Sequence, residues 1–186
     1  IILAAGQGTR LKSALPKPLH RIGGRPMLAW SLDAATAANA ARIVTILPRA
    51  SEQIQNWLDG VEFCIQDKPR GTGHAALAAA PALKDFDGVA VIMFADTPLV
   101  TASTLSRLAA SVEDHTSLAV LGFETADPTG YGRLVTDSNG DVTHIVEHRD
   151  ATADERCITL VNGGIMAVRC PLLFTWLEQV QANNKN

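Results

Sequence analysis

The sequence contains little cysteine, few aromatic residues and no long apolar run. Its three cysteines, Cys64, Cys157 and Cys170, are far apart and lack the spacing of a disulfide framework, a metal site or a redox motif. We interpret them as reduced residues of a cytoplasmic protein. The longest apolar run, residues 88–95, is far shorter than the ~20 residues that a membrane-spanning helix requires. The first residues indicate a strand followed by a loop, and no signal peptide.

Charge is also scarce. Charged residues make up 19% of the chain, the formal net charge is −3, and the basic residues are scattered. This distribution argues against a nucleic-acid-binding surface and against a polybasic membrane patch. Apolar residues, by contrast, make up 47% of the 186 residues, which is enough to bury one substantial core. We therefore expect one globular domain that binds small molecules and neither nucleic acid nor a membrane. Whether it forms a homo-oligomer stays open.

Short β-rich runs alternate with helical patterns along the first two thirds of the chain. The pattern predicts strands at residues 1–4, 43–47, 61–65, 89–94 and 118–123. It predicts helices at residues 27–41, 51–58 (capped by Ser51), 74–83 and 101–113. Strands separated by helices of this length favour right-handed crossovers. We therefore expect an α/β, Rossmann-like fold with a mixed, mostly parallel sheet flanked by helices.

The pattern changes after residue 124. Two β-rich runs surround Asn139-Gly140, a pair that tolerates the positive φ angles of a type I′ turn. This segment therefore predicts an antiparallel hairpin inserted beside the sheet. A strand at residues 159–168 and a helix at residues 171–180 complete the predicted elements, with Pro171 at the first helical position.

The segment that follows the first strand is rich in glycine and in cationic side chains. Gly6 and Gly8 allow close approach to a turn whose backbone N–H groups point one way, which suits phosphate oxygens. Arg10 and Lys17 add positive charge. Leu11 stands where both the dinucleotide fingerprint and the P-loop require glycine, so neither motif is complete. An ordinary glycine turn is the alternative interpretation of this loop taken alone.

Several motifs together resemble one known family. LAAGQGTRL and LPKPL, at residues 3–11 and 15–19, match the signature of the sugar nucleotidyltransferases. QDKPRGTGHA, FADTPL, DPTGYGRL, VEHRDAT and VNGGI follow in the order found in the N-terminal uridylyltransferase (pyrophosphorylase) domain of bifunctional UDP-N-acetylglucosamine pyrophosphorylase / glucosamine-1-phosphate N-acetyltransferases. The resemblance covers essentially the whole chain. It implies a nucleotidyltransferase fold in which residues 1–186 form a single domain, truncated at the C-terminus and without the β-helix acetyltransferase domain.

The resemblance implies Mg²⁺-dependent transfer of UMP from UTP to N-acetylglucosamine 1-phosphate, giving UDP-N-acetylglucosamine and pyrophosphate. Both reacting groups are anionic, so the enzyme must bring repelling charges into line and needs no covalent nucleophile. By resemblance, Arg10 neutralises the departing pyrophosphate and Lys17 contacts the α-phosphate. Asp96 follows an apolar strand and would bind Mg²⁺, which prefers hard oxygen ligands.

The resemblance also assigns the binding residues. Those for the nucleotide are Leu3, Ala4, Ala5, Gly6, Gly8, Thr9, Gln66, Gly71 and Thr72. Those for the sugar are Gly130, Glu147 and Asn162. We interpret His74 as a loop or helix-start residue because the attacking phosphate needs no general base. Tyr131 and Arg133 are interpreted as a packing residue and a hairpin-face residue.

Phe94, Ala95 and Gly163 replace the family's usual tyrosine, glycine and threonine, which leaves the exact sugar and base open. One alternative is a nucleotidyltransferase that uses another sugar 1-phosphate or dTTP, CTP or GTP. Another is a non-catalytic nucleotide-sugar-binding regulatory domain. Such a domain need not keep Arg10, Lys17 and Asp96 together, so their joint presence favours the enzyme.

Overall fold

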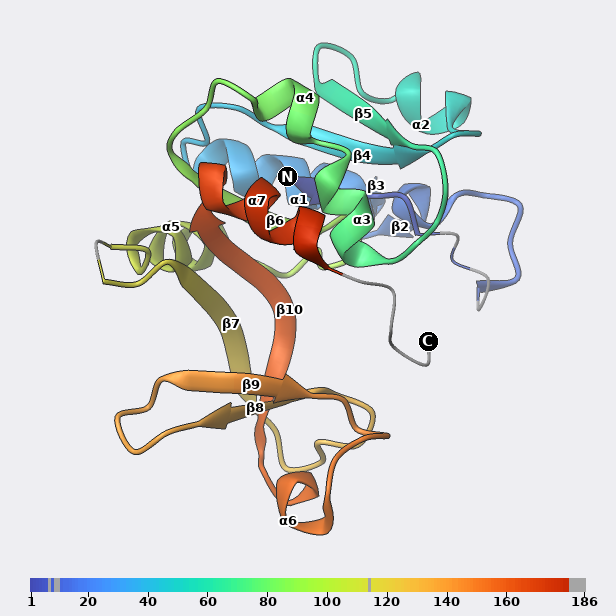
Figure 1. Ribbon diagram of the computed structural model, residues 1–186. Coiled ribbons are helices and arrows are strands. Elements are labelled where there is room, and N and C mark those ends of the chain that lie inside the picture. Colours follow the sequence, from blue (N-terminus) through green and yellow to red (C-terminus); the bar gives the residue numbers. More distant parts are fainter. Residues whose placement is uncertain (7, 9–10, 114, 181–186) are drawn as a thin grey trace. The chain divides into compact units, whose positions relative to one another are not determined.

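The structure, a computed structural model, describes residues 1–6, 8, 11–113 and 115–180 (Figure 1). The chain divides into two compact units, one of residues 1–119 with 167–186 and one of residues 120–166. Within the described ranges, no helix has the length and apolar character needed to cross a membrane.

A parallel sheet forms the centre of the first unit. Its strands are β1 (Ile2–Leu3), β4 (Val44–Pro48), β5 (Glu62–Gln66) and β6 (Val89–Phe94). They pair in the order β5-β4-β1-β6, and the end of β10 (Leu160–Arg169) follows β6. Leu3 lies opposite Ile46 on one side and Phe94 on the other. The winding of the chain therefore reverses at β1, and the predicted mostly parallel α/β sheet is confirmed.

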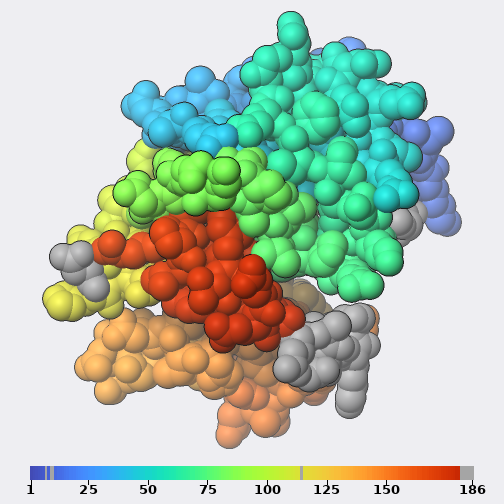
Figure 2. Space-filling view, turned by 45° about the horizontal axis from the view of Figure 1, so that its top comes forward, coloured from blue at the N-terminus to red at the C-terminus, as the bar shows by residue number. Residues whose placement is uncertain are grey.

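Helices cover both faces of this sheet. They are α1 (Met27–Ala37), α3 (Thr72–Leu77), α4 (Ala80–Leu83), α5 (Ala102–Ala110) and α7 (Cys170–Gln179). In Figure 1, α3, α4 and α7 lie in front of the sheet and α1 lies behind it, where it packs against α5. Figure 2 shows α7, in red, against the green surface of α3 and α4.

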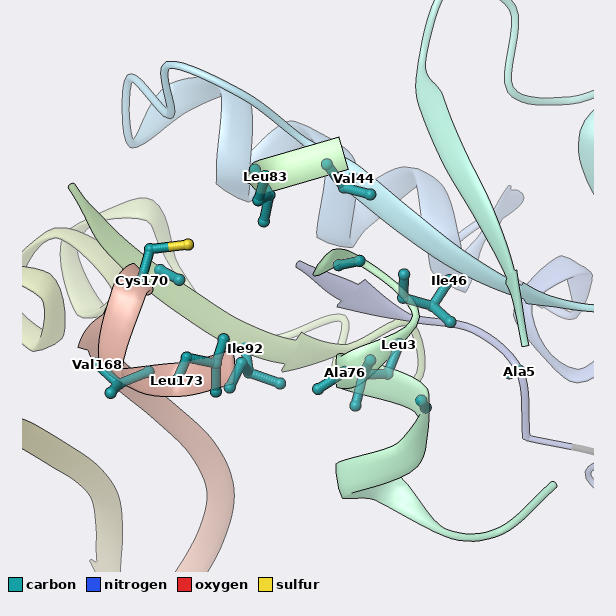
Figure 3. Packing of buried hydrophobic residues seen from close by; sticks show 13 residues of the cluster. Leu3, Ala5, Val44, Ile46, Ala76, Leu83, Ile92, Val168, Cys170 and Leu173 are labelled. Atoms are coloured by element: carbon teal, nitrogen blue, oxygen red, sulfur yellow. The ribbon is translucent and has the colours of Figure 1, made fainter. Parts of the chain in front are cut away.

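The core beneath α3, α4 and α7 contains side chains from these three helices and from β1, β4, β6 and the end of β10 (Figure 3). Leu3, Ile46 and Ile92 point from the strands toward this face, and Leu83 and Leu173 meet them from the helices. Burying one such aliphatic side chain contributes about 1.5–3 kcal/mol. This packing holds β1 in the middle of the sheet and so fixes where the glycine loop begins.

Four short elements complete the first unit. They are the 3-10 helix η2 (Lys17–Leu19), the paired strands β2 (Arg21–Ile22) and β3 (Arg25–Pro26), and the helix α2 (Glu52–Gln55). Ser51 occupies the N-cap position of α2, but its Oγ accepts a hydrogen bond from Gln55 Nε2 at 2.8 Å, and it makes no side-chain cap. The predicted capping by Ser51 is therefore wrong in its contacts.

The second unit is antiparallel. Its elements are β8 (Arg133–Thr136), β9 (Val142–Val146), α6 (Ala153–Arg156) and parts of β7 (Leu118–Glu124) and β10 (Leu160–Arg169). β8 pairs antiparallel with β9 and with β10, so the predicted hairpin is confirmed. α6 begins with a capping box between Thr152 and Glu155, which the sequence interpretation had not included.

Local chemistry corrects three predicted details. The predicted helix 74–83 is two helices, because Pro81, the second residue of α4, has no N–H to donate across the break. The helix predicted to residue 41 ends at Ala37, because Asn39 adopts a φ of 56° and Ala40 N–H bonds to Ala35 O, which closes the helix. Gly140 has a φ of 87° whereas Asn139 lies outside the positive-φ region, so the turn is not type I′.

Candidate functional site

The candidate site lies at the carboxyl edge of the parallel sheet, where β1, β5 and β6 end. Ligands of open α/β sheets bind at this edge, where the strand order reverses. A pocket of about 360 Å³ opens there. Its lining includes these predicted residues: Leu3, Ala4, Ala5, Gly6, Lys17, Gln66, Gly71, Thr72 and Asp96. Phe94 and Ala95, the two positions that depart from the family pattern, also line it, as do Pro18, Pro69 and Ala75, for which the sequence analysis gives no role.

Lys17 and Asp96 meet in this pocket. Lys17 Nζ donates a hydrogen bond to Asp96 Oδ2, and the two groups form an ion pair. The side chains are 35% and 32% exposed, so both remain accessible from the pocket. A cation and a carboxylate in one cavity provide a counter-charge for phosphate and an oxygen ligand for a cation, respectively.

The glycine loop and two prolines position Lys17. Gly8 has a φ of 57°, and a Cβ atom added there would lie 2.7 Å from Lys17 Cβ. Pro16 and Pro18 flank the lysine, and Leu19 N–H bonds to Pro16 O at 2.9 Å to close the turn of η2. Gly8 is therefore required because both its backbone conformation and the packing of Lys17 exclude a side chain. Gly8 itself does not line the pocket.

The end of β6 positions Asp96. Ala95 N–H bonds to Leu3 O at 3.0 Å, which ties the residue before Asp96 to the central strand. Phe94 O accepts hydrogen bonds from Thr97 Oγ1 at 2.8 Å and from Ser31 Oγ at 3.2 Å. These bonds stop the strand and turn the chain at Asp96, so that its carboxylate faces the pocket from a rigid element.

Gln66, at the end of β5, is buried and its orientation is set by two contacts. Its Nε2 donates to Gly71 O at 3.2 Å and lies 3.1 Å from His74 Nδ1. Because both contacts engage the nitrogen, the carboxamide oxygen is the atom with which Gln66 can address a ligand. His74 lies in α3 and takes part in this arrangement, in agreement with the helix-start role expected for it.

The residues present fit a hard cation of the Mg²⁺ type held through phosphate. Among the residues that the structure describes, no group of three or more His, Cys, Asp or Glu side chains gathers to hold a metal. Asp96 offers a single carboxylate beside the pocket. Mg²⁺ characteristically takes one or two carboxylates and completes its shell with substrate phosphates and water, so one carboxylate is sufficient.

The predicted sugar-binding residues come together around Gly132 in the second unit. Gly132 O accepts a hydrogen bond from Asn162 N–H at 2.8 Å, and a Cβ atom added at Gly132 would lie 3.5 Å from Glu147 Oε1. Gly130 is exposed two residues before it, with a φ of 84°. Asn162 Oδ1 accepts from Gly164 N–H at 2.8 Å, which fixes the carboxamide.

Two further positions in this unit, Gly163 and Arg133, are closely packed. A Cβ atom at Gly163 would lie 2.7 Å from the backbone oxygen of Leu121, so the threonine that the family usually has there does not fit this backbone. Arg133, interpreted from the sequence as a hairpin-face residue, is 1% exposed. Arg133 begins β8 of the hairpin, and its side chain is buried against the segments around His148 and Arg156.

Two predicted residues, Thr9 and Arg10, lie outside the described residues. Of the two predicted catalytic residues, Lys17 is thus the one whose position the structure gives. The roles assigned to all the site residues stay predictions.

Comparison with known proteins gives consistent matches. The sequence profile of the MobA-like NTP transferase domain matches residues 1–155. The bifunctional protein GlmU of Maricaulis maris (strain MCS10) is 47% identical over 188 residues, covering 100% of this chain and 42% of that protein. The bifunctional protein GlmU of Parvibaculum lavamentivorans is 45% identical over 190 residues, covering 100% of this chain and 41% of that protein. The chain therefore spans about two fifths of the length of these relatives, and the resemblance read from the motifs is confirmed.

Solved structures show the same fold. The crystal structure of UDP-glucose pyrophosphorylase complexed with UDP-glucose aligns with a TM-score of 0.79 at 18% identity, covering 100% of this chain and 80% of that one. The apo crystal structure of UDP-glucose pyrophosphorylase aligns with a TM-score of 0.75 at 18% identity, covering 98% of this chain and 82% of that one.

Proposed function

Because this chain belongs to the family of MobA-like NTP transferase domains, we propose that it transfers UMP from UTP to N-acetylglucosamine 1-phosphate. The products are UDP-N-acetylglucosamine and pyrophosphate. The observation that carries the proposal is the meeting of Lys17 and Asp96 in a pocket that Gly6 and Gln66 also line. A nucleoside triphosphate needs all of these: a cation for phosphate, a carboxylate for its metal, and an open backbone and a fixed polar group for its other parts.

The reaction places an anionic nucleophile beside an anionic triphosphate. Lys17 would contact the α-phosphate and lower the repulsion as the sugar phosphate oxygen approaches. Gly6 leaves room for phosphate oxygens, since a Cβ atom added there meets nothing within 4 Å. Proline residues on both sides of Lys17 restrict the backbone from which the ammonium group extends, and charges placed before the reaction contribute most to catalysis.

Asp96 would hold Mg²⁺ together with the triphosphate oxygens. When bound there, the ion neutralises phosphate charge and orients the reacting groups. Lys17 contacts Oδ2 of this carboxylate, so the ammonium group and the metal-holding group lie side by side in the pocket.

Gln66 would select the base. Uracil presents an N3–H donor between two carbonyl acceptors, and the oriented carboxamide oxygen of Gln66 accepts from such a donor. Cytosine has an acceptor at N3, so the same oxygen disfavours CTP. Gly71 and Thr72, beside Gln66, would contact the base through the backbone.

Glu147 and Asn162 would bind the sugar through its hydroxyl and acetamido groups, with the backbone at Gly130 approaching closely. In this proposal the two units together form one nucleotidyltransferase domain with UTP and a sugar 1-phosphate as its partners, working in the cytoplasm.

The test measures pyrophosphate release by the purified protein with each of four nucleoside triphosphates, UTP, dTTP, CTP and GTP. The acceptors are N-acetylglucosamine 1-phosphate, glucose 1-phosphate and galactose 1-phosphate, with Mg²⁺ or with EDTA. We expect turnover with UTP and N-acetylglucosamine 1-phosphate, loss of turnover in EDTA, and loss in an Asp96→Asn variant. Preferred turnover with another nucleotide or acceptor would contradict the stated substrates, and tight nucleotide-sugar binding without any turnover would identify a regulatory domain.

A further inference from the structure

Arg133, the first residue of β8, is the largest fully buried side chain of the second unit. It lies opposite Val146 of β9 and Val161 of β10, in the middle of three antiparallel strands. Its exposed fraction is 1%. A guanidinium group is always charged, and burying it is costly unless its hydrogen bonds satisfy it.

The hydrogen bonds of Arg133 join three separate segments, the last of them the end of α6. Nη1 donates to the Tyr131 carbonyl, and Nη2 donates to His148 Nδ1 at 3.1 Å and to the Arg156 carbonyl at 3.4 Å. Because a guanidinium can only donate, Nδ1 of His148 must accept and carries no proton in this contact. The planar guanidinium group of Arg133 therefore connects the segments around residues 131, 148 and 156.

Those segments carry the proposed sugar contacts. Tyr131 lies between Gly130 and Gly132, and His148 directly follows Glu147. Glu147 O also accepts hydrogen bonds from Asp150 N–H and Ala151 N–H, each at 3.0 Å, which makes a compact turn after the carboxylate. Arg133 therefore contacts both the segment that contains Gly130 and the segment that contains Glu147.

Filling space does not by itself account for an arginine here. An apolar side chain of similar length fills the same volume without the cost of desolvating a charge. Nε of Arg133 is buried without a hydrogen-bond partner among the described residues, so the group is not fully satisfied. What arginine adds is a planar group whose two terminal nitrogens reach three acceptors in a fixed geometry.

We propose that Arg133 is a positioning residue that sets the sugar-binding segments around Gly130 and Glu147 through its contacts with Tyr131 and His148. The inference rests on the proposed function for the identity of the bound sugar. Arg133 itself contacts no substrate in this account and acts through the two loops.

Four variants test this. Arg133→Met fills a similar volume but has no guanidinium donors, and Arg133→Lys keeps the charge but presents a single ammonium group. His148→Leu removes the acceptor, whereas His148→Asn keeps an acceptor oxygen at the same branch. We expect kcat/KM for the sugar 1-phosphate to fall about 10- to 100-fold in Arg133→Met and Arg133→Lys. In both arginine variants we expect KM for UTP to stay within about twofold of wild type. We expect His148→Leu to lose kcat/KM for the sugar 1-phosphate as the arginine variants do, and His148→Asn to keep the wild-type value.

Hydrogen exchange gives a readout that does not depend on turnover. In Arg133→Lys, the amides of Tyr131, Asp150 and Ala151 should exchange at least about tenfold faster while those paired between β8 and β9 keep their protection. Unchanged exchange at these amides, or equal increases in KM for UTP and for the sugar phosphate, would overturn the proposal. If wild type turns over no sugar phosphate, the proposed function fails, and the exchange result still decides whether Arg133 holds the two loops. If Arg133→Met does not fold, the lysine and His148 variants decide the outcome.

Discussion

Removing the ammonium group of Lys17 should affect catalysis far more than folding. The Lys17–Asp96 pair is about one third exposed on each side, and ion pairs accessible to water contribute only about 0–1 kcal/mol to stability. Loss of a fixed donor that stabilises a developing charge costs about 3–4 kcal/mol of transition-state stabilisation. A Lys17→Ala variant should therefore lose a factor of about 10²–10³ in kcat while its free energy of unfolding changes by less than about 1 kcal/mol.

The assay combines steady-state pyrophosphate release at varied UTP with urea unfolding. Lys12→Ala is the matched control, because Lys12 is an exposed lysine of the same loop that does not line the pocket. We expect this control to keep both kcat and KM. A Lys17→Ala variant whose KM for UTP rises while kcat stays constant would refute the reasoning and make Lys17 a ground-state binder. Equal losses in both variants would show that only the total charge of the loop matters.

Three other changes have defined outcomes. Gly8→Ala should lower the free energy of unfolding by about 1–2 kcal/mol in urea titrations, because of its positive φ and the crowding of Lys17, whereas Gly6→Ala should not. Gln66→Leu should reduce the preference for UTP over CTP in pyrophosphate release about 10- to 100-fold, and an unchanged preference would remove Gln66 from base selection. Hydrogen bonds from Thr152 hold the pKa of Glu155 below its ordinary value of 4.5. The stability from this contact is therefore present above pH 4.5 and is lost as pH falls through the lower folded-state pKa of Glu155. Hydrogen exchange at the amides of α6 should accelerate over this pH range in wild type and should not change with pH in this way in Glu155→Gln.

The parts of the fold that follow from local pattern were predictable. The run at residues 89–94 is apolar on both faces, as a central parallel strand must be, and β6 has those bounds. The break at Pro81 follows from local chemistry that the sequence displays, since a proline cannot donate within a helix. Predicting the early end of α1 would have required knowing that Asn39 takes a left-handed conformation, which competes with continuation of the helix.

The candidate site was predictable where motifs and strand ends coincide. Lys17 and Asp96 are far apart in the sequence, and the family resemblance together with the strand-end rule placed both at one edge of the sheet. The burial of Arg133 was not predictable, because α6 and loops distant in sequence cover this position on β8. The alternation along a four-residue strand shows which residues share a face and says nothing about what packs on it.

The central claim is that the residues around Lys17 and Asp96 form one nucleotide pocket. Backbone amide chemical shifts of labelled protein titrated with UTP and Mg²⁺ test it directly. We expect the shifts to concentrate at residues 3–6, at Lys17, at residues 66–72 and at Asp96. A second cavity of about 230 Å³, lined by residues 38–44 and Leu105 among others, provides the contrast. Shifts concentrated around that second cavity, with none near Lys17 and Asp96, would contradict the account.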